Sequence, residues 1–204
     1  MYQFMRPGLV AMAATVLAAC SSDNSGGTGQ NVNVPVQPPP DIRILHASAD
    51  APNVDVLLNN DRVLTNVAFK QGSGFLSVPT QSYRVRVEGR LPGGNVTVID
   101  VPSLALGINQ QYTVVALGNV AAIEPLVLSR TRSAIPAGSV RAQVLHAAPN
   151  APRVDVFVTT PGANLAATAP LGTFSFKESL GPVDVPAGNY QIRCAVNLFY
   201  PFYE

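Results

Sequence analysis

The sequence predicts an all-β protein built from two tandem antiparallel β-sandwich modules, the second of them apparently truncated. Two observations support this prediction. From Asp41 onward the chain repeats itself, and in each repeat short β-branched and apolar runs alternate with Pro, Gly, Asn and Asp at the spacing of sandwich strands and turns. The composition agrees, since 12% of the 204 residues are charged while 18 are Pro and 16 are Gly.

The repeat is clearest around two histidines. Residues 44–56, I-L-H-A-S-A-D-A-P-N-V-D-V, recur one hundred positions later as residues 144–156, V-L-H-A-A-P-N-A-P-R-V-D-V. A second block, V-P-T-Q-S-Y-R-V-R at 78–86, recurs as V-P-A-G-N-Y-Q-I-R at 185–193. The larger offset of this block places extra residues near 160–164, and an insertion between two strands is where a β domain tolerates length.

The first copy contains enough short β-rich runs for one sandwich and no helical pattern. Asn59, Asn60 and Asp61 can supply the left-handed residues of a hairpin turn. Tyr83, Val85 and Val87 alternate with polar neighbours, as expected for a half-buried strand. The strands that we expect lie at residues 42–45, 54–58, 62–64, 74–78, 83–87, 96–101, 111–117 and 124–128.

The second copy departs from the first after Arg193. The first copy predicts three further strands there, whereas the chain reads C-A-V-N-L-F-Y-P-F-Y-E over residues 194–204. Such a sandwich exposes apolar surface and unpaired strand edges. Two explanations remain open. Either the reading frame is truncated or frameshifted, or the aromatic tail docks on the open face or on a partner.

The first 19 residues have the features of a secretory signal peptide. Arg6 is followed by an apolar run from Leu9 to Ala19, which is too short to span a membrane. Small residues then precede a cysteine. Residues 1–19 are therefore expected to be removed on export.

The end of this segment, Leu17-Ala18-Ala19-Cys20, resembles the lipobox of bacterial lipoproteins. This resemblance implies that Cys20 carries a diacylglycerol and is usually N-acylated after cleavage, so that two or three acyl chains hold the protein at a membrane. Ser21 is not Asp, which in the same family favours the outer membrane if the source is Gram-negative. An ordinary signal peptide with an incidental cysteine is the alternative.

The rest of the chain divides into a tether and two modules. Residues 20–40 are Gly/Ser-rich and then Pro-rich, which is typical of a flexible linker that ends in a stiffer segment. The modules are expected at 41–132 and 139–204. Without the signal peptide the chain has 12 basic and 12 acidic residues, so the charge indicates no nucleic-acid partner.

The two blocks of the repeat together resemble the DUF4397 family of bacterial exported proteins. The shared pattern is L-H-A-x-x-x-A-P-x-V-D-V followed by V-P-x-x-x-Y-x-[VI]-R, and it covers nearly all of residues 41–193. The resemblance implies tandem β-sandwiches of an immunoglobulin-like or transthyretin-like type, often lipid-anchored or on the cell surface. It implies no catalytic residues and no cofactor.

Candidate chemistry is confined to the paired histidines. His46 and His146 lie near Asp55 and Asp155, and a His–Asp pair can orient a general base. No nucleophile motif accompanies them, because G-x-S-x-G is absent and Ser48 becomes Ala in the second copy. We therefore expect histidines that bond a turn backbone or the aspartate, no catalytic residue and no metal site. An exported hydrolase using His46 or His146 is the alternative.

Three further features have structural interpretations. Tyr83 and Tyr190 resemble the tyrosine corner of immunoglobulin-like sandwiches, whose hydroxyl bonds back to the backbone. Arg86 and Arg193 are expected on a solvated face, although they could bind an acidic ligand. If Cys20 carries lipid, Cys194 has no partner for an intramolecular disulfide.

These observations together predict a non-catalytic lipoprotein of the cell envelope, with a structural, adhesive or binding role. Its expected partners are the membrane, through Cys20, and an unidentified envelope protein or glycan.

The lipid anchor has a direct test. Cells that express the chain and are fed radiolabelled palmitate should yield labelled protein, because acylation requires the thiol of Cys20. The variant Cys20→Ser should give no label. Label that survives this substitution, or a wild-type chain without label, would contradict the anchor.

Overall fold

The structure is a computed structural model that describes residues 36–196, all within one compact unit of the chain. The predictions for the signal peptide, for Cys20 and for most of the tether lie outside the described residues, as does the tail from residue 197. The described part is all-β, as predicted, with two short 3-10 turns, η1 (Val120–Ala122) and η2 (Leu165–Ala167).

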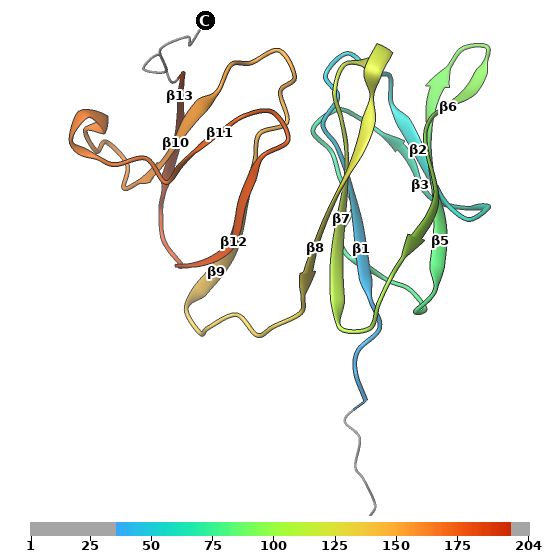
Figure 1. Cartoon of the computed structure of the whole chain (residues 1–204), viewed down its shortest axis with the longest axis horizontal. Helices are drawn as coiled ribbons and strands as arrows, with labels where there is room; N and C mark the ends of the chain where they lie inside the picture. The colour runs from blue at the N-terminus through green and yellow to red at the C-terminus, as the bar shows by residue number, and fades with distance from the viewer. Residues whose placement is uncertain (1–35, 197–204) are drawn as a thin grey trace, which may run out of the picture. The chain divides into compact units, whose positions relative to one another are not determined.

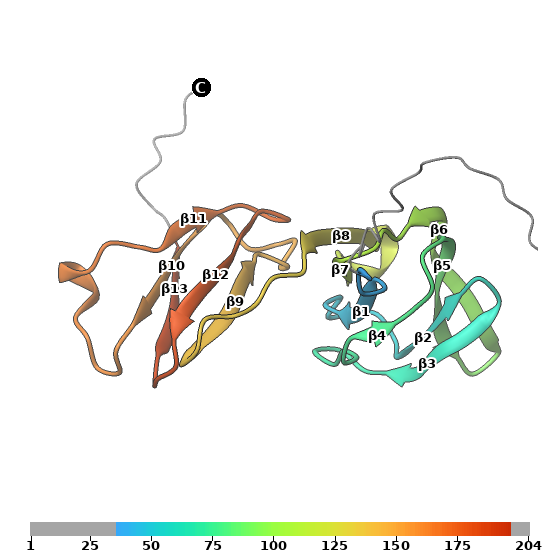
Figure 2. The ribbon, with the colours of Figure 1, turned by 90° about the horizontal axis from the view of Figure 1, so that it is seen from below.

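The first module consists of two four-stranded sheets. One sheet has the order β4 (Leu76–Ser77), β1 (Asp41–His46), β7 (Gln110–Leu117) and β8 (Glu124–Thr131). The other has the order β3 (Asp61–Val67), β2 (Val54–Leu58), β5 (Ser82–Leu91) and β6 (Gly94–Ala105). Figures 1 and 2 show the two sheets on opposite sides of this module.

Strand pairing in the first module is antiparallel with one exception. β1 and β7 run parallel, with Asp41 opposite Gln111 and His46 opposite Ala116. Antiparallel neighbours can be joined by a tight hairpin, whereas this pair is brought together from distant parts of the chain. The prediction of an antiparallel sandwich is therefore confirmed except at β1 and β7.

The core of the first module lies between its two sheets. Alternate residues of β1 and β7 supply one side, and alternate residues of β2 and β5 supply the other. This is the arrangement of a sandwich, in which each sheet buries the apolar face of the other. The buried apolar residues of these four strands are Ile42, Ile44, Val114, Ala116, Val54, Val56, Leu58, Tyr83, Val85 and Val87.

The predicted strands of the first copy are all present; the strand at 54–58 has the predicted ends, and the ends of the others are shifted. The alternation in β5 is as predicted, since Tyr83, Val85 and Val87 are buried. Asn59 has φ 56°, so it supplies the left-handed residue of the β2–β3 hairpin. The strand expected at 74–78 is shorter than predicted, because only Leu76 and Ser77 pair with β1.

Residues 139–196 of the second module contain counterparts of the first five strands. One sheet has the order β11 (Gly172–Phe174), β10 (Val154–Thr159) and β13 (Gln191–Val196), and the other pairs β12 (Ser179–Pro186) with β9 (Ser139–Leu145). The extra residues of this copy lie between β10 and β11 and include η2. Residues 139–196 hold no equivalent of β6, β7 or β8.

Within residues 36–196, the inner side of β13 is uncovered. Val85 of β5 is 0% exposed, whereas its counterpart Ile192 of β13 is 66% exposed. The two residues occupy matching places in the repeat, so their difference reflects the strands around them and not their own chemistry.

The packed part of the chain begins a few residues before the predicted boundary at residue 41. The carbonyl of Pro38 accepts a hydrogen bond from the Asn109 amide, and that of Pro40 accepts one from the Val78 amide. The last prolines of the predicted linker therefore contact the first module. Over residues 36–196, the structure contains no helix of the length and hydrophobicity that a membrane span requires.

Substitution of Val85 and of its counterpart Ile192 tests whether the inner side of β5 is covered while that of β13 is not. Val85→Ala should lower the free energy of unfolding of the first module by about 2 kcal/mol, because it removes buried methyl groups and leaves a cavity. Ile192→Ala should change stability by less than about 0.5 kcal/mol, since its side chain is exposed. Urea denaturation of the two variants measures both. Equal losses would contradict an uncovered β13.

Candidate functional site

The first candidate is the loop that follows β1. His46 is the last residue of β1 and is fully buried. Its Nε2 lies 3.1 Å from the Pro52 carbonyl, and its Nδ1 lies 3.3 Å from the Ser48 amide. The carbonyl is an acceptor and the amide a donor, so Nε2 carries the proton and Nδ1 accepts. Both ring nitrogens thus hold the loop between β1 and β2 in place.

Ser48 has a structural role in the same loop. Its hydroxyl donates to the carbonyl of Gly118 at 2.6 Å, which ties the loop to the end of β7. Gly118 has φ +96°, a conformation that favours glycine. A serine nucleophile requires a hydroxyl that is free to attack and a nearby base. The Ser48 hydroxyl is engaged in holding the loop.

The second copy repeats part of this arrangement. Nε2 of His146 lies 3.2 Å from the Pro152 carbonyl, as in the first copy. In this copy the Nδ1 atom of His146 is buried and has no hydrogen-bond partner among residues 36–196. The prediction that the histidines bond a turn backbone is confirmed in both modules.

Asp55 has partners other than the histidine. The Asn66 amide donates to its carboxylate at 2.8 Å, and Asn95 donates at 3.0 Å. Guanidinium nitrogens of Arg90 and Arg62 lie 3.3 and 3.6 Å from the oxygens of the same carboxylate. The carboxylate therefore anchors the β2–β3 and β5–β6 hairpins to β2. In the second copy, the Thr173 hydroxyl donates to Asp155.

The pKa of Asp55 follows from these contacts. Burial by itself raises the pKa of this carboxyl. Hydrogen bonds from the Asn66 amide and the Asn95 side chain lower it, and the charges of Arg90 and Arg62 add to that effect. Together they hold the pKa below its ordinary value of 3.8, so Asp55 is a stable buried anion and a poor proton acceptor.

The tyrosine and arginine pairs also serve the framework. Tyr83 donates its hydroxyl hydrogen to the Pro79 carbonyl at 3.1 Å, and Tyr190 donates to the Pro186 carbonyl at 2.8 Å. The predicted tyrosine corners are therefore present. Arg193 donates to the Ala163 carbonyl at 2.7 Å, which places its guanidinium on the inserted loop.

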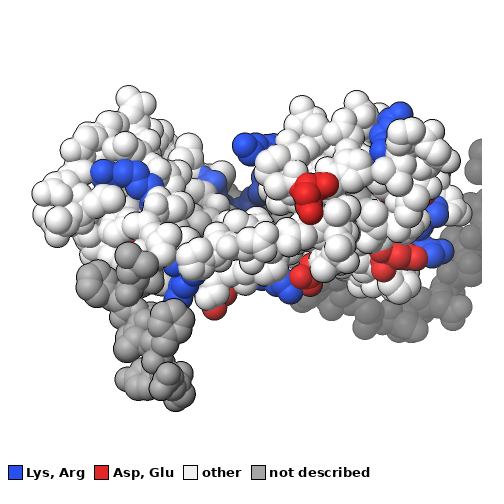
Figure 3. All heavy atoms as spheres, turned by 90° about the horizontal axis from the view of Figure 1, so that it is seen from above, with Lys and Arg blue, Asp and Glu red and all other residues white. Residues whose placement is uncertain are grey.

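Arg86 is held by its surroundings in the same way. Its guanidinium lies 3.4 Å from the Asn59 carbonyl and 3.6 Å from the Glu88 carboxylate. Within residues 36–196 no three His, Cys, Asp or Glu side chains lie together as a metal would require. On the face shown in Figure 3, charged side chains are scattered among uncharged ones.

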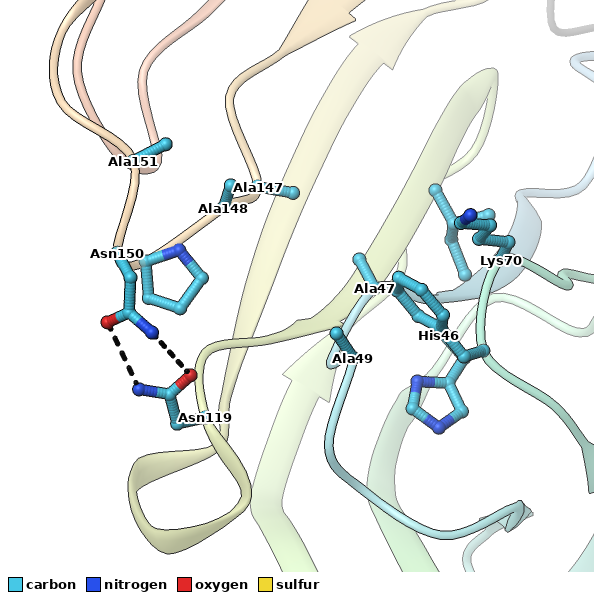
Figure 4. A pocket seen from close by; sticks show the side chains of 12 residues that line it. His46, Ala47, Ala49, Lys70, Asn119, Ala147, Ala148, Asn150 and Ala151 are labelled. Carbon is cyan, nitrogen blue, oxygen red and sulfur yellow. Dashed lines mark hydrogen bonds between the residues drawn. The ribbon is translucent and has the colours of Figure 1, made fainter.

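The loops that follow β1 and β9 line one pocket of about 590 Å³. Figure 4 shows small side chains from both loops around it, with Asn119 and Asn150 joined by two hydrogen bonds at 3.3 and 3.4 Å. The lining is mostly apolar, which suits an apolar group better than a charged one. The labelled alanines around it are Ala47, Ala49, Ala147, Ala148 and Ala151.

A second groove, of about 290 Å³, lies in the second module, in the space between its two sheets. Its lining comes from β9, β10, β11, β13 and the loop after β9. Sequence reasoning predicted the exposed apolar surface but not its location, which depends on how the sheets face each other. The residues that line the groove are Val144, Leu145, His146, Ala147, Ala148, Ala151, Val154, Val156, Phe174 and Cys194.

Cys194 is the only cysteine among residues 36–196, and its thiol is free and exposed. The predicted lipidation site, Cys20, lies outside the described residues. The structure therefore gives the environment of one of the two cysteines in the chain.

A protein-family model matches more than half of the chain. The model of a domain of unknown function, DUF4397, matches residues 40–157, which run from the start of the first module into β10 of the second. The chain belongs to the DUF4397 family. The match ends earlier than the pattern of the repeat, which continues to Arg193. Comparison with curated proteins gave no match.

The lowered pKa of Asp55 predicts how the stability of this DUF4397 module depends on pH. The pKa is lower in the folded state, so the carboxylate stabilises the fold above about pH 4 and loses that effect as the pH falls toward the folded pKa. Asp55→Asn should reduce the free energy of unfolding at about pH 7. In a plot of the urea unfolding midpoint against pH, it should also reduce the fall of the midpoint at acid pH. An acid limb as steep as that of the wild type would contradict the assignment.

Proposed function

We propose that the protein is a non-catalytic β-sandwich lipoprotein, anchored in the cell envelope through Cys20, that binds an envelope protein or a glycan. The observation that carries the proposal is the uncovered inner side of the second module. Ile192 is 66% exposed there, beside an apolar groove. Apolar surface of this kind favours association, because burying it releases water from contact with the side chains.

The anchor supports the same proposal from the sequence. The lipobox-like segment before Cys20, the Gly/Ser-rich linker and the balanced charge fit a module that is held close to a surface. If the source is Gram-negative, Ser21 favours the outer membrane. A fixed location raises the effective concentration of the module near partners in the same envelope.

The histidine loops argue for binding over catalysis. In the first module both nitrogens of His46 are used within the loop, and the Ser48 hydroxyl is bonded to Gly118. An exported hydrolase using His46 or His146 remains the alternative function. Ester hydrolysis by the purified chain that is lost in His46→Ala with His146→Ala would favour it.

Photo-crosslinking in intact cells tests the binding function. A photoreactive residue in place of Ile192 should give crosslinked products, because this position lies on the uncovered side of β13. The matched control is the same residue in place of Leu91, which is also exposed but lies at the tip of the β5–β6 hairpin. Products of Ile192 should be lost when Cys20→Ser releases the chain from its membrane. Equal products at both positions would contradict the proposal.

A further inference from the structure

The first module shows what fills the place that is open in the second. β7 lies beside β1, and its residues Val114 and Ala116 are part of the core. β7 also covers β5 from the opposite sheet, since the residues of β5 that point inward belong to the same cluster. β7 therefore pairs with the backbone groups along one edge of β1 and also covers the core.

The counterparts of the covered residues are exposed in the second module. Tyr83 is 6% exposed and its counterpart Tyr190 is 41% exposed. Val87 is 1% exposed, whereas its counterpart Cys194 is exposed and lines the groove. These differences lie on the side of β13 that a strand in the place of β7 would cover.

β9 has an edge that corresponds to the edge of β1 with which β7 pairs. In the first module the Ala47 amide donates to the Ala116 carbonyl of β7. In the second module the His146 amide donates to Glu178, on the side of β12. Successive amides of a strand point to opposite edges, so the amides of Leu145 and Ala147 point away from β12. Residues 139–196 place no strand along that edge.

From this internal comparison we infer that β9 accepts an extended strand from a partner polypeptide, parallel to β9 and in the place of β7. This inference rests on the proposed binding function and names its mode. Main-chain hydrogen bonds along the edge supply affinity, and alternate side chains in the groove supply selectivity.

The groove defines the chemistry of the partner strand. Residues that point inward must be aliphatic or aromatic, because Val144, Val156 and Phe174 line the space that receives them. In the register of β1 and β7, moved by one hundred positions, the partner residue in the place of Val114 lies opposite Val144. A charge at that position would be buried without a counter-ion, which strongly disfavours binding.

A peptide of residues 108–118, I-N-Q-Q-Y-T-V-V-A-L-G, is a probe with this chemistry, because it carries the sequence of β7. The protein is the full chain with Cys20→Ser, which leaves Cys194 as the only thiol. At a peptide concentration one hundred times Kd, the reaction of Cys194 with a maleimide should slow about 100-fold, in proportion to the free protein.

Hydrogen exchange identifies how the peptide binds. Exchange of the Leu145 and Ala147 amides should slow with the peptide, while that of His146, already bonded to Glu178, should change little. The control peptide carries Val114→Lys and Ala116→Lys, which places two charges on the inward side. It should protect neither the thiol nor the amides.

Several results would overturn the inference. These are an unprotected Cys194, protection of Cys194 without slower exchange at Leu145, and equal protection by the control peptide. Protection that grows with protein concentration in the absence of peptide would also overturn it, because a second copy of the chain would then be the occupant. Crosslinking at Ile192 in cells is independent of this assay, so the binding function can hold even if strand addition fails.

Discussion

The parallel pairing of β1 with β7 is the contact on which the first module depends. β7 lies between β1 and β8, and its side chains close the core over β2 and β5. Each sheet has an apolar face that is stable only when the other covers it. In the second module, where residues 139–196 place no strand beside β9, the inner residues of β13 are exposed. The strands that follow β5 in the first module, β7 among them, therefore separate its closed sandwich from the open arrangement of residues 139–196.

The histidine loops illustrate how a repeated motif can serve the fold. His46 and His146 bond the carbonyls of Pro52 and Pro152, which fixes the connection between the two sheets in each module. The copies differ at position 48, where Ser48 bonds Gly118 and its counterpart is Ala148. Ala148 has no hydroxyl with which to make such a bond. The contact between the histidine and the proline carbonyl is therefore common to both copies, whereas the bond from residue 48 to the end of β7 belongs to the first copy.

Much of the first module could be predicted from single residues. The alternation of Tyr83, Val85 and Val87 indicated which side of β5 is buried, and the positive φ of Asn59 confirmed the turn. The partners of Asp55 could not be predicted. Asn66 and Asn95 reach this carboxylate from two hairpins, and their approach depends on strand register. The parallel direction of β7 was missed for the same reason, because local patterns do not specify which distant strand is a neighbour.

By itself the sequence determined that the chain is all-β, that it repeats, and that it carries the pattern of the DUF4397 family, since strand periodicity and repeated motifs are local properties. It also indicated that the residues after Arg193 do not follow the pattern of the first copy. Only the tertiary structure decided which surfaces of the second module are exposed. The edge of β9 and the groove beside Cys194 are formed by strands far apart in the sequence. The exposure of a side chain there depends on which of these strands pack over it, and local sequence patterns do not specify this packing.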